Sequence, residues 1–253
     1  MLMRLRDKVA VVTGGQRGIG FAIAEKFARE GAHVIIADIG DATQEAASLS
    51  AIGANKARFC KTDVGSEREI RSMVDAVVSE HGRIDVLVNN AGIEFYKPVT
   101  TTTEDEWDRL MRVNLKGVFL CSKAAIPAMR QSGGVIVNVA SELGLVGEAN
   151  VAAYCASKGG VVMLSKAMAI DHGPEGIRVN CLCPGPVSTQ LLEDVFLASD
   201  DPEWMRQSFE RRMILNRLGT PEECANAALF LASSESSFMA GANLVLDGGW
   251  TTR

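Results

Sequence analysis

Short apolar segments alternate with amphipathic segments along almost the whole chain. Seven segments rich in valine and isoleucine are predicted to form buried strands: Lys8–Thr13, Ala32–Ala37, Ala57–Lys61, Asp85–Val88, Val135–Val139, Arg178–Cys181 and Leu244–Leu246. Each is too continuously apolar to keep one face in water, as expected for a parallel sheet covered on both faces. Between them, six segments have helical periodicity: Ile19–Arg29, Ala42–Ile52, Glu67–Glu80, Glu104–Met129, Ala152–Asp171 and Pro221–Leu231. This order predicts the α/β class, with a doubly wound parallel sheet of about seven strands and helices on both faces.

The 253 residues fit a single domain, 1–253, because no linker, composition shift or internal repeat interrupts the alternation. The exception is the long segment 186–213, between the sixth and seventh strands. Met205, Phe209 and Met213 recur there at helical spacing, which predicts helices with one apolar face. Two interpretations stay open for this segment. It is either extra core or an oligomer contact, or it is a lid on the substrate side of a pocket.

The helical segment Ala152–Asp171 is apolar or small on almost every side, with Lys158 and Lys166 as its only cations. A helix that is apolar all round must be buried all round. The sheet can cover only one side of it. We therefore expect a second copy of the chain to cover the other side, and the protein to be a homo-oligomer.

Charge and hydropathy exclude several classes of function. The chain has 26 lysine and arginine residues against 31 aspartate and glutamate residues, a net charge of −5, which offers no basic surface to nucleic acid or an anionic membrane. The longest uncharged stretch, Val179–Leu192, contains two prolines and is too short to span a membrane. Charges at Arg4, Arg6, Asp7 and Lys8 leave no room for the apolar region of a secretory signal, so a cytoplasmic location is expected.

The six cysteines lie scattered through apolar segments, so reduced thiols are expected. Cys181 and Cys183 form the one close pair, and their single-residue spacer is shorter than zinc-ligand spacings. With only three histidines in the chain, no metal site is expected.

A glycine-rich turn follows the first strand, as Thr-Gly-Gly-Gln-Arg-Gly-Ile-Gly over residues 13–20, and leads directly into a helical segment. Glycines let the backbone turn tightly and approach a pyrophosphate, while the helix N-terminus presents free N–H groups and partial positive charge. Asp38 ends the second strand, eighteen residues after Gly20, where a carboxylate suits an adenosine ribose diol. The pattern predicts a Rossmann-like dinucleotide site.

Asp38 also bears on the choice between the two nicotinamide dinucleotides. A 2′-phosphate about 4 Å from its carboxylate would face about 4 kcal/mol of repulsion per charge at an effective dielectric near 20. This favours NAD over NADP. Arg17 opposes that preference, because an arginine in the glycine turn can meet a phosphate, although a surface arginine is equally natural there.

Tyr154 and Lys158 are four residues apart on the apolar helical segment, so they share a helix face. A lysine ammonium close to a phenol can lower the pKa of that phenol and make it a base near neutral pH. Alone, such a pair is usually a packed ring beside a lysine stem. Ser141 follows the fifth strand, at the carboxyl edge of the sheet where open α/β folds bind ligands.

Together these motifs resemble the short-chain dehydrogenase/reductase family over nearly the whole chain. The matching residues, in order, are the glycine turn at Thr13–Gly20, Asp63-Val64, Asn89-Asn90-Ala91-Gly92, Asn114, Ser141, Tyr154 with Lys158, Pro184-Gly185 and Thr189. The resemblance implies that Tyr154 is the general acid/base and that Lys158 lowers its pKa and binds the nicotinamide ribose. It implies that Ser141 hydrogen-bonds the substrate oxygen. It implies that Asn114 holds a water in a proton relay to Lys158, although this amide can also satisfy a helix bend.

The resemblance also implies a cofactor site. Asp63 and Val64 would flank the adenine, Asn90 and Gly92 would shape the wall beside the adenosine ribose, and Thr189 would bond the carboxamide. The full set of expected cofactor-binding residues is Gly14, Gln16, Arg17, Gly18, Ile19, Gly20, Asp38, Asp63, Val64, Asn90, Gly92, Tyr154, Lys158, Pro184, Gly185, Val187 and Thr189.

The substrate pocket is expected after Ser141, after Gly92 and in the segment 186–213. The candidate lining residues are Glu94, Tyr96, Glu142, Leu143, Gly144, Leu191, Leu192 and Trp204. Two acids could accept hydrogen bonds from a hydroxylated substrate, which hints at a polyol or sugar.

The leading hypothesis is an oxidoreductase that reversibly transfers hydride between NAD and a secondary alcohol or ketone. Two alternatives remain: a non-catalytic dinucleotide-binding regulator, and dehydratase or epimerase chemistry on the same scaffold. The family resemblance further implies a homotetramer.

Overall fold

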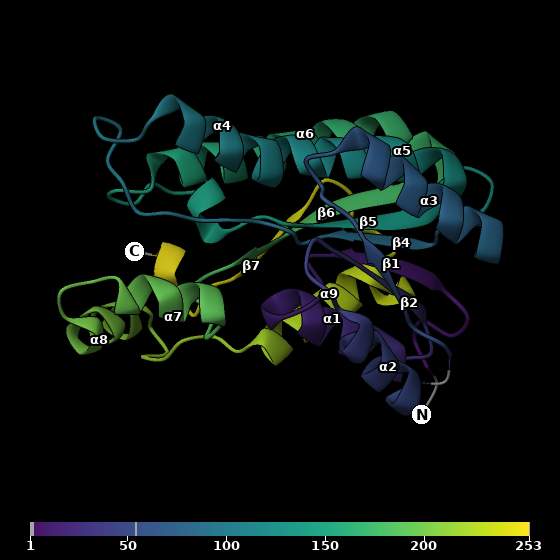
Figure 1. Cartoon of the computed structure of the whole chain (residues 1–253), viewed down its shortest axis with the longest axis horizontal. Coiled ribbons are helices and arrows are strands. Elements are labelled where there is room, and N and C mark those ends of the chain that lie inside the picture. Colours follow the sequence, from purple (N-terminus) through teal and green to yellow (C-terminus); the bar gives the residue numbers. More distant parts are fainter. Residues whose placement is uncertain (1–2, 54, 253) are drawn as a thin grey trace.

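The computed structural model describes residues 3–53 and 55–252. Its sheet has seven parallel strands in the order β3-β2-β1-β4-β5-β6-β7 (Figure 1). The strands are β1 (Val9–Thr13), β2 (His33–Asp38), β3 (Arg58–Lys61), β4 (Val86–Asn89), β5 (Gly134–Val139), β6 (Ile177–Pro184) and β7 (Asn243–Leu246). The predicted Rossmann-like sheet and all seven predicted strands are confirmed. The largest difference is at β6, which continues three residues beyond the predicted Cys181 because Leu182, Cys183 and Pro184 pair with β7.

Helices cover both faces of this sheet. They are α1 (Gly18–Arg29), α2 (Thr43–Ile52), α3 (Glu67–His81), α4 (Glu104–Met111), α5 (Gly117–Met129), α6 (Ala152–His172), α7 (Gln190–Leu197), α8 (Pro202–Arg212) and α9 (Pro221–Ala232). Figure 1 shows α3, α4, α5 and α6 on one face and α1, α2 and α9 on the other, with α7 and α8 beyond the edge of the sheet. Two large apolar cores, one on each face, hold the layers together.

The predicted helix Glu104–Met129 is continuous but changes its winding in the middle. Arg112–Lys116 is a π-helical turn between α4 and α5. The extra residue of such a turn redirects side chains and is often found at functional sites. Its central residue, Asn114, is buried. The helical periodicity of the sequence did not reveal this local change.

The segment 186–213 contains α7 and α8. Phe209 and Met213, predicted to lie on one apolar face, are buried and pack with Leu192 and Phe196 into a small separate core. Met205 is partly buried against the same core. Trp250, which follows β7, packs its ring edge-on against Phe209 at 5.9 Å between ring centroids. The chain beyond the last strand therefore supports this segment.

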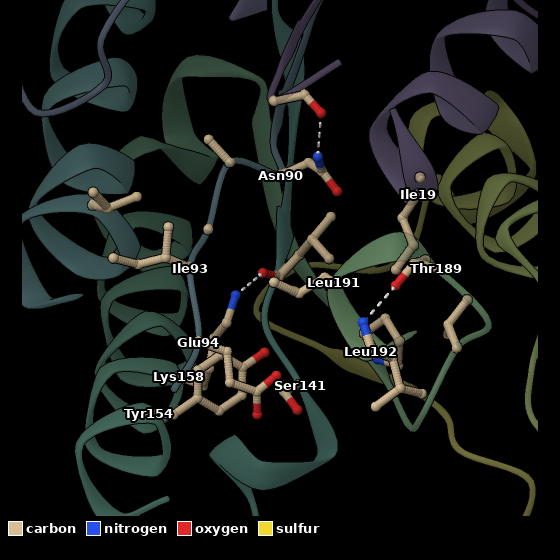
Figure 2. Close-up of a pocket in the computed structure, with 18 of the residues that line it drawn as sticks. Ile19, Asn90, Ile93, Glu94, Ser141, Tyr154, Lys158, Thr189, Leu191 and Leu192 are labelled. Atoms are coloured by element: carbon tan, nitrogen blue, oxygen red, sulfur yellow. Dashed lines mark hydrogen bonds between the residues drawn. The ribbon is translucent and has the colours of Figure 1, made fainter. Parts of the chain in front are cut away.

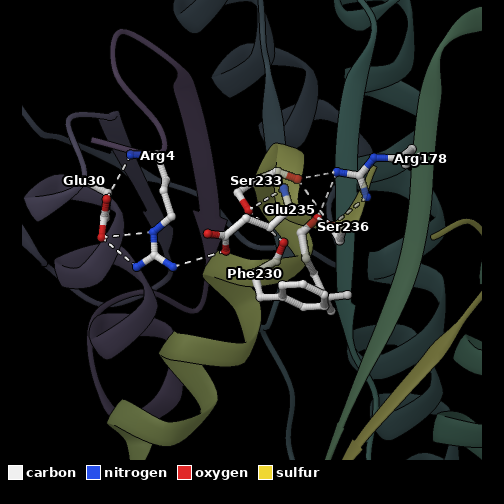
Figure 3. A network of polar contacts seen from close by, with 8 residues as sticks. Arg4, Glu30, Arg178, Phe230, Ser233, Glu235 and Ser236 are labelled. Atoms are coloured by element: carbon white, nitrogen blue, oxygen red, sulfur yellow. Dashed lines mark hydrogen bonds and ion pairs between the residues drawn. The ribbon is translucent and has the colours of Figure 1, made fainter. Parts of the chain in front are cut away.

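Helix α9 is anchored at its carboxyl end by Arg178, which lies on β6. The guanidinium donates to the carbonyl oxygens of Leu231 and Ser233, and also to the hydroxyl of Ser236 (Figure 3). These carbonyls have no partner within the helix, so a half-buried cation is well suited to satisfy them. On the other side, Arg4 bridges Glu30 and Glu235.

Helix α6 confirms only half of the burial expected from its sequence. Val161 and Val162 are buried against the rest of the chain, whereas Met163 is 62% and Ile170 is 77% exposed. In a single chain one apolar face of α6 thus lies open to water.

Within the residues that the structure describes, the helices are all too short or too polar to cross a bilayer. The same residues contain no group of three or more potential ligands that could hold a metal ion.

Candidate active site

A cleft of about 630 Å³ runs along the carboxyl ends of the strands. One wall comes from the glycine turn, β2 and the beginning of α7, and the other comes from the loop after β4, from Ser141 and from α6 (Figure 2). The strand order reverses between β1 and β4, and ligands of open α/β sheets bind at such a point.

The glycine turn has the shape of a phosphate cradle. Gly14 and Gly18 have φ angles of +62° and +58°, which other residues rarely adopt. A Cβ atom on Gly20 would lie 2.1 Å from the carbonyl oxygen of Gly14, so only glycine fits there. Gly20 itself lies behind the cleft wall. Because α1 begins at Gly18, its N-terminal N–H groups face the cleft, and the residues present fit a dinucleotide pyrophosphate.

The side chain of Asp38 lies in the cleft and is held by two backbone groups. Its carboxylate accepts the N–H of Gln16 at 3.0 Å and that of Gly40 at 3.1 Å. These bonds fix the carboxylate oxygens at the end of β2 and leave further lone pairs for a ligand. Arg17 also lines the cleft, and its side chain is exposed.

The structure brings most of the other expected cofactor residues to this cleft. Gln16, Ile19, Asp63, Val64, Gly92, Pro184, Gly185, Val187 and Thr189 line it. Asp63 is additionally paired with Arg112 at 3.1 Å. Asn90 also lines the cleft. Its amide nitrogen donates to the carbonyl oxygens of Thr13 and Gly14, and these bonds connect the end of β4 to the glycine turn. Thr189 caps α7, because its hydroxyl accepts the N–H of Leu192 at 3.4 Å.

Ser141, Tyr154 and Lys158 lie together on one wall of the cleft, away from Ile19 of the glycine turn (Figure 2). The Lys158 ammonium donates to the carbonyl oxygen of Val139 at 2.8 Å and lies 5.5 Å from the centroid of the Tyr154 ring. Lys158 and Ser141 are both buried. The three side chains come from two segments, the end of β5 and the first turns of α6.

The pKa of Tyr154 is raised well above its usual value. Desolvation is the main cause, and the carboxylates of Glu94 and Glu142 add to it, while the Ser141 hydroxyl acts in the opposite direction. Desolvation also lowers the pKa of Lys158 to about 8. Burial and the two carboxylates therefore act against the lowering of the Tyr154 pKa that is expected from Lys158.

Asn114 lies behind the cleft rather than in its lining. Its amide oxygen accepts the N–H of Ile93 at 2.8 Å, and its amide nitrogen donates to the Ile93 carbonyl at 2.8 Å and to the Ser157 hydroxyl at 3.2 Å. The π-helical turn thus fixes the loop after β4, which carries Glu94, against α6.

The substrate end of the cleft differs in part from the sequence prediction. Glu94, Tyr96, Glu142, Leu143, Leu191 and Leu192 line it as expected. Trp204 does not, because it points outward from α8 and is 65% exposed. Gly144 does not either: a Cβ there would lie 2.8 Å from the backbone of Lys158, so this glycine permits a close approach to α6.

Sequence reasoning missed Phe209, Glu148 and Trp250 as lining residues. Trp250 follows β7 after a turn at Gly248 and Gly249, whose φ angles are +62° and +91°. The Gly-Gly pair was the available signal, because it marks a sharp turn after β7.

The comparisons with known proteins agree with this geometry. A family model described as enoyl-(acyl carrier protein) reductase matches residues 14–251. A short-chain type dehydrogenase/reductase from Mycobacterium marinum superimposes with a TM-score of 0.93 at 36% identity, covering 100% of this chain and 98% of that one. The chain belongs to the short-chain dehydrogenase/reductase family and is an oxidoreductase.

Among its relatives, meso-2,3-butanediol dehydrogenase of Serratia marcescens is 41% identical over 249 residues, covering 98% of this chain and 96% of the relative. Cyclopentanol dehydrogenase of Comamonas testosteroni is 42% identical over 251 residues, covering 98% of each.

Proposed function

We propose that this protein is an NAD-dependent dehydrogenase that reversibly interconverts a secondary alcohol and its ketone. The observation that carries the proposal is the placing of Ser141, Tyr154 and Lys158 on one wall of a cleft whose other end holds the glycine turn and Asp38. Relatives whose names denote alcohol dehydrogenases support the same reaction class.

A bound nicotinamide cofactor would supply the hydride acceptor or donor, held by the glycine turn, Asp38, Lys158 and Thr189. The protein's own residues then transfer the hydroxyl proton of the substrate and hydrogen-bond the substrate oxygen. In oxidation the Tyr154 phenolate takes the proton of the alcohol, and in reduction the Tyr154 phenol donates that proton to the ketone oxygen. Ser141 hydrogen-bonds that oxygen, and Lys158 stabilises charge on the phenol. Asn114 fixes the loop after β4 beside these residues. We also propose that Asn114 takes part in a proton relay to Lys158.

One sheet carries both ends of the cleft, which supports a single domain over 1–253. We assign 186–213 the role of a lid over the substrate end, because α7 begins at the cleft and Phe209 lines it. A reducing, cytoplasmic location is part of the proposal, since the six cysteines are free thiols.

The preferred substrate is a neutral polyol or sugar. Glu94 and Glu142 both face the substrate end, and among the described residues neither forms a salt bridge. Burial raises the pKa of both groups to about 7, and above that pH their ionised carboxylates favour hydroxyl donors and disfavour anions.

In a panel run with each nicotinamide cofactor, we therefore expect kcat/KM for 2,3-butanediol or a sugar alcohol to exceed that for cyclopentanol about tenfold or more, because hydrogen bonds to charged groups are worth about 1.5–3 kcal/mol. Steady-state absorbance of the reduced cofactor measures this. Equal or better activity on cyclopentanol would contradict the polyol assignment.

The same assay addresses the alternatives. The intact Ser141, Tyr154 and Lys158 oppose a non-catalytic regulator. In a dehydratase or epimerase the cofactor would be reduced and reoxidised within one cycle, so reduced cofactor would not accumulate.

The protein is proposed to be a homotetramer, with the exposed face of α6 as one contact. Met163 and Ile170 lie open on this helix, and a neighbouring surface hollow is lined by Leu115, Phe119 and Leu164. Burial of this face would remove apolar side chains from water.

Met163→Glu would place a charge in this contact, and we expect it to reduce the mass of the wild-type assembly, measured by light scattering at micromolar concentration. Ile52→Glu, on α2, is the matched control and should leave the mass unchanged. A wild-type protein that is monomeric would contradict the proposal.

A further inference from the structure

The hydroxyl of Ser141 is already engaged by its own neighbours. A serine hydroxyl has one proton and two lone pairs. The Ser141 hydroxyl donates its proton to Oε2 of Glu142 at 2.6 Å, and it accepts the backbone N–H of Leu143 at 3.1 Å. One lone pair is left for a further donor. In this arrangement Ser141 can accept a hydrogen bond from a substrate but has no proton to give it.

Ketone reduction needs the opposite arrangement. A ketone oxygen is only an acceptor, and the negative charge that develops on it must be met by donors. If Glu142 carries a proton, its own O–H can donate to Ser141 Oγ across the same short distance. Both lone pairs of Ser141 are then occupied, and its proton is free to point at the substrate oxygen. The hydrogen bond reverses without any movement of the heavy atoms.

We propose that Glu142 is a positioning residue that sets the direction of the Ser141 hydroxyl, so that ketone reduction requires the protonated form of Glu142. The inference rests on the proposed function and extends it. The acting group on the substrate remains Ser141, and Glu142 acts through it.

The surroundings of Glu142 allow both protonation states near neutral pH. Glu142 is 4% exposed, and no cation forms a salt bridge to it among the described residues. The titratable groups that face it are Glu94 and Tyr96 from the loop after β4, Tyr154 and Lys158 from α6, and Cys183 from β6. Desolvation raises the pKa of Glu142 to about 7 against the lowering effect of the Ser141 hydrogen bond, and the charge of Glu94 raises it further.

Glu142→Gln provides the direct test. Glutamine can donate from its amide nitrogen to Ser141 and cannot ionise. We would measure kcat/KM for reduction of 3-hydroxy-2-butanone and cyclopentanone at saturating reduced NAD. We expect the ratio of the variant's value to the wild-type value to rise about tenfold or more between about pH 6 and about pH 8.5, as the wild type loses a donor to the developing oxyanion. A ratio that stays constant over this range overturns the proposal.

Two further variants separate positioning from a structural effect. Glu94→Gln is the matched control, because it changes the neighbouring carboxylate in the same way but leaves Glu142 able to ionise. It should keep the fall in reduction with rising pH but move it to lower pH, since it removes a charge that raises the pKa of Glu142. If Glu142→Gln does not fold, this shift of the pH profile in Glu94→Gln tests the proposal on its own. An unshifted profile in Glu94→Gln would count against the proposal.

In a Ser141→Ala background, adding Glu142→Gln should no longer change the pH profile. The same rise in the ratio without Ser141 would overturn the proposal. If the wild type reduces no ketone at any pH, the proposed function fails. If it reduces them with a profile parallel to that of Glu142→Gln, only the role of Glu142 fails.

Discussion

Tyr154→Phe is expected to lower kcat for alcohol oxidation about 10³-fold, within the range that a general acid or base contributes. The substitution removes one oxygen from a phenol on the cleft wall beside Ser141 and Lys158. The ring, which makes the contact with the Lys158 ammonium, is retained. Binding of the cofactor should therefore persist while turnover is lost. Initial rates of cofactor reduction measure kcat, and fluorescence titration with reduced cofactor measures the binding of the cofactor.

Tyr96→Phe is the matched control for this experiment. Tyr96 is the other phenol of the chain, it lines the same cleft, and its pKa is also raised by burial. Its loss should affect substrate affinity far more than kcat. If Tyr154→Phe keeps a tenth or more of the wild-type rate, or if both variants lose the rate equally, Tyr154 is not the proton-transfer group.

Asp38→Asn is expected to lower the preference for NAD over NADP about 100-fold or more. A carboxylate about 4 Å from a 2′-phosphate costs about 4 kcal/mol per charge at an effective dielectric near 20, and the amide removes that repulsion. The amide oxygen can still accept one of the two backbone N–H groups, of Gln16 and Gly40, that hold the carboxylate. The measurement is the ratio of kcat/KM values for the two cofactors with a single alcohol.

Asp41→Asn is the control for this second prediction, because Asp41 is an exposed carboxylate nearby that bonds to Thr43 and does not line the cleft. It should leave the ratio unchanged. An unaltered ratio in Asp38→Asn would mean that the preference is set elsewhere in the cleft.

The sequence was sufficient for the features that depend on neighbours along the chain. Strand β1, the glycine turn and α1 follow one another directly, and Tyr154 and Lys158 are one helical turn apart, so local periodicity predicted them. It was insufficient where distant segments meet. The sequence predicted Trp204 as a lining residue, yet it is Trp250 that lines the cleft, because its ring packs against Phe209.

The acidity of Tyr154 illustrates the same limit. Spacing along α6 revealed the lysine but not the two carboxylates, which arrive from the loops after β4 and β5 and act against it. The local winding at Asn114 was also invisible, because a single additional residue in a turn hardly alters the apolar periodicity of a helix.

The small core formed by Leu192, Phe196, Phe209 and Met213 is separate from the cores that hold the sheet. Substitutions at sites that share no contacts have nearly additive effects on stability. The residues that shape the substrate end can therefore be exchanged without disturbing the half of the molecule that carries the glycine turn. Such modularity makes α7 and α8 the natural place for divergence, and for laboratory evolution, toward alcohols of different size.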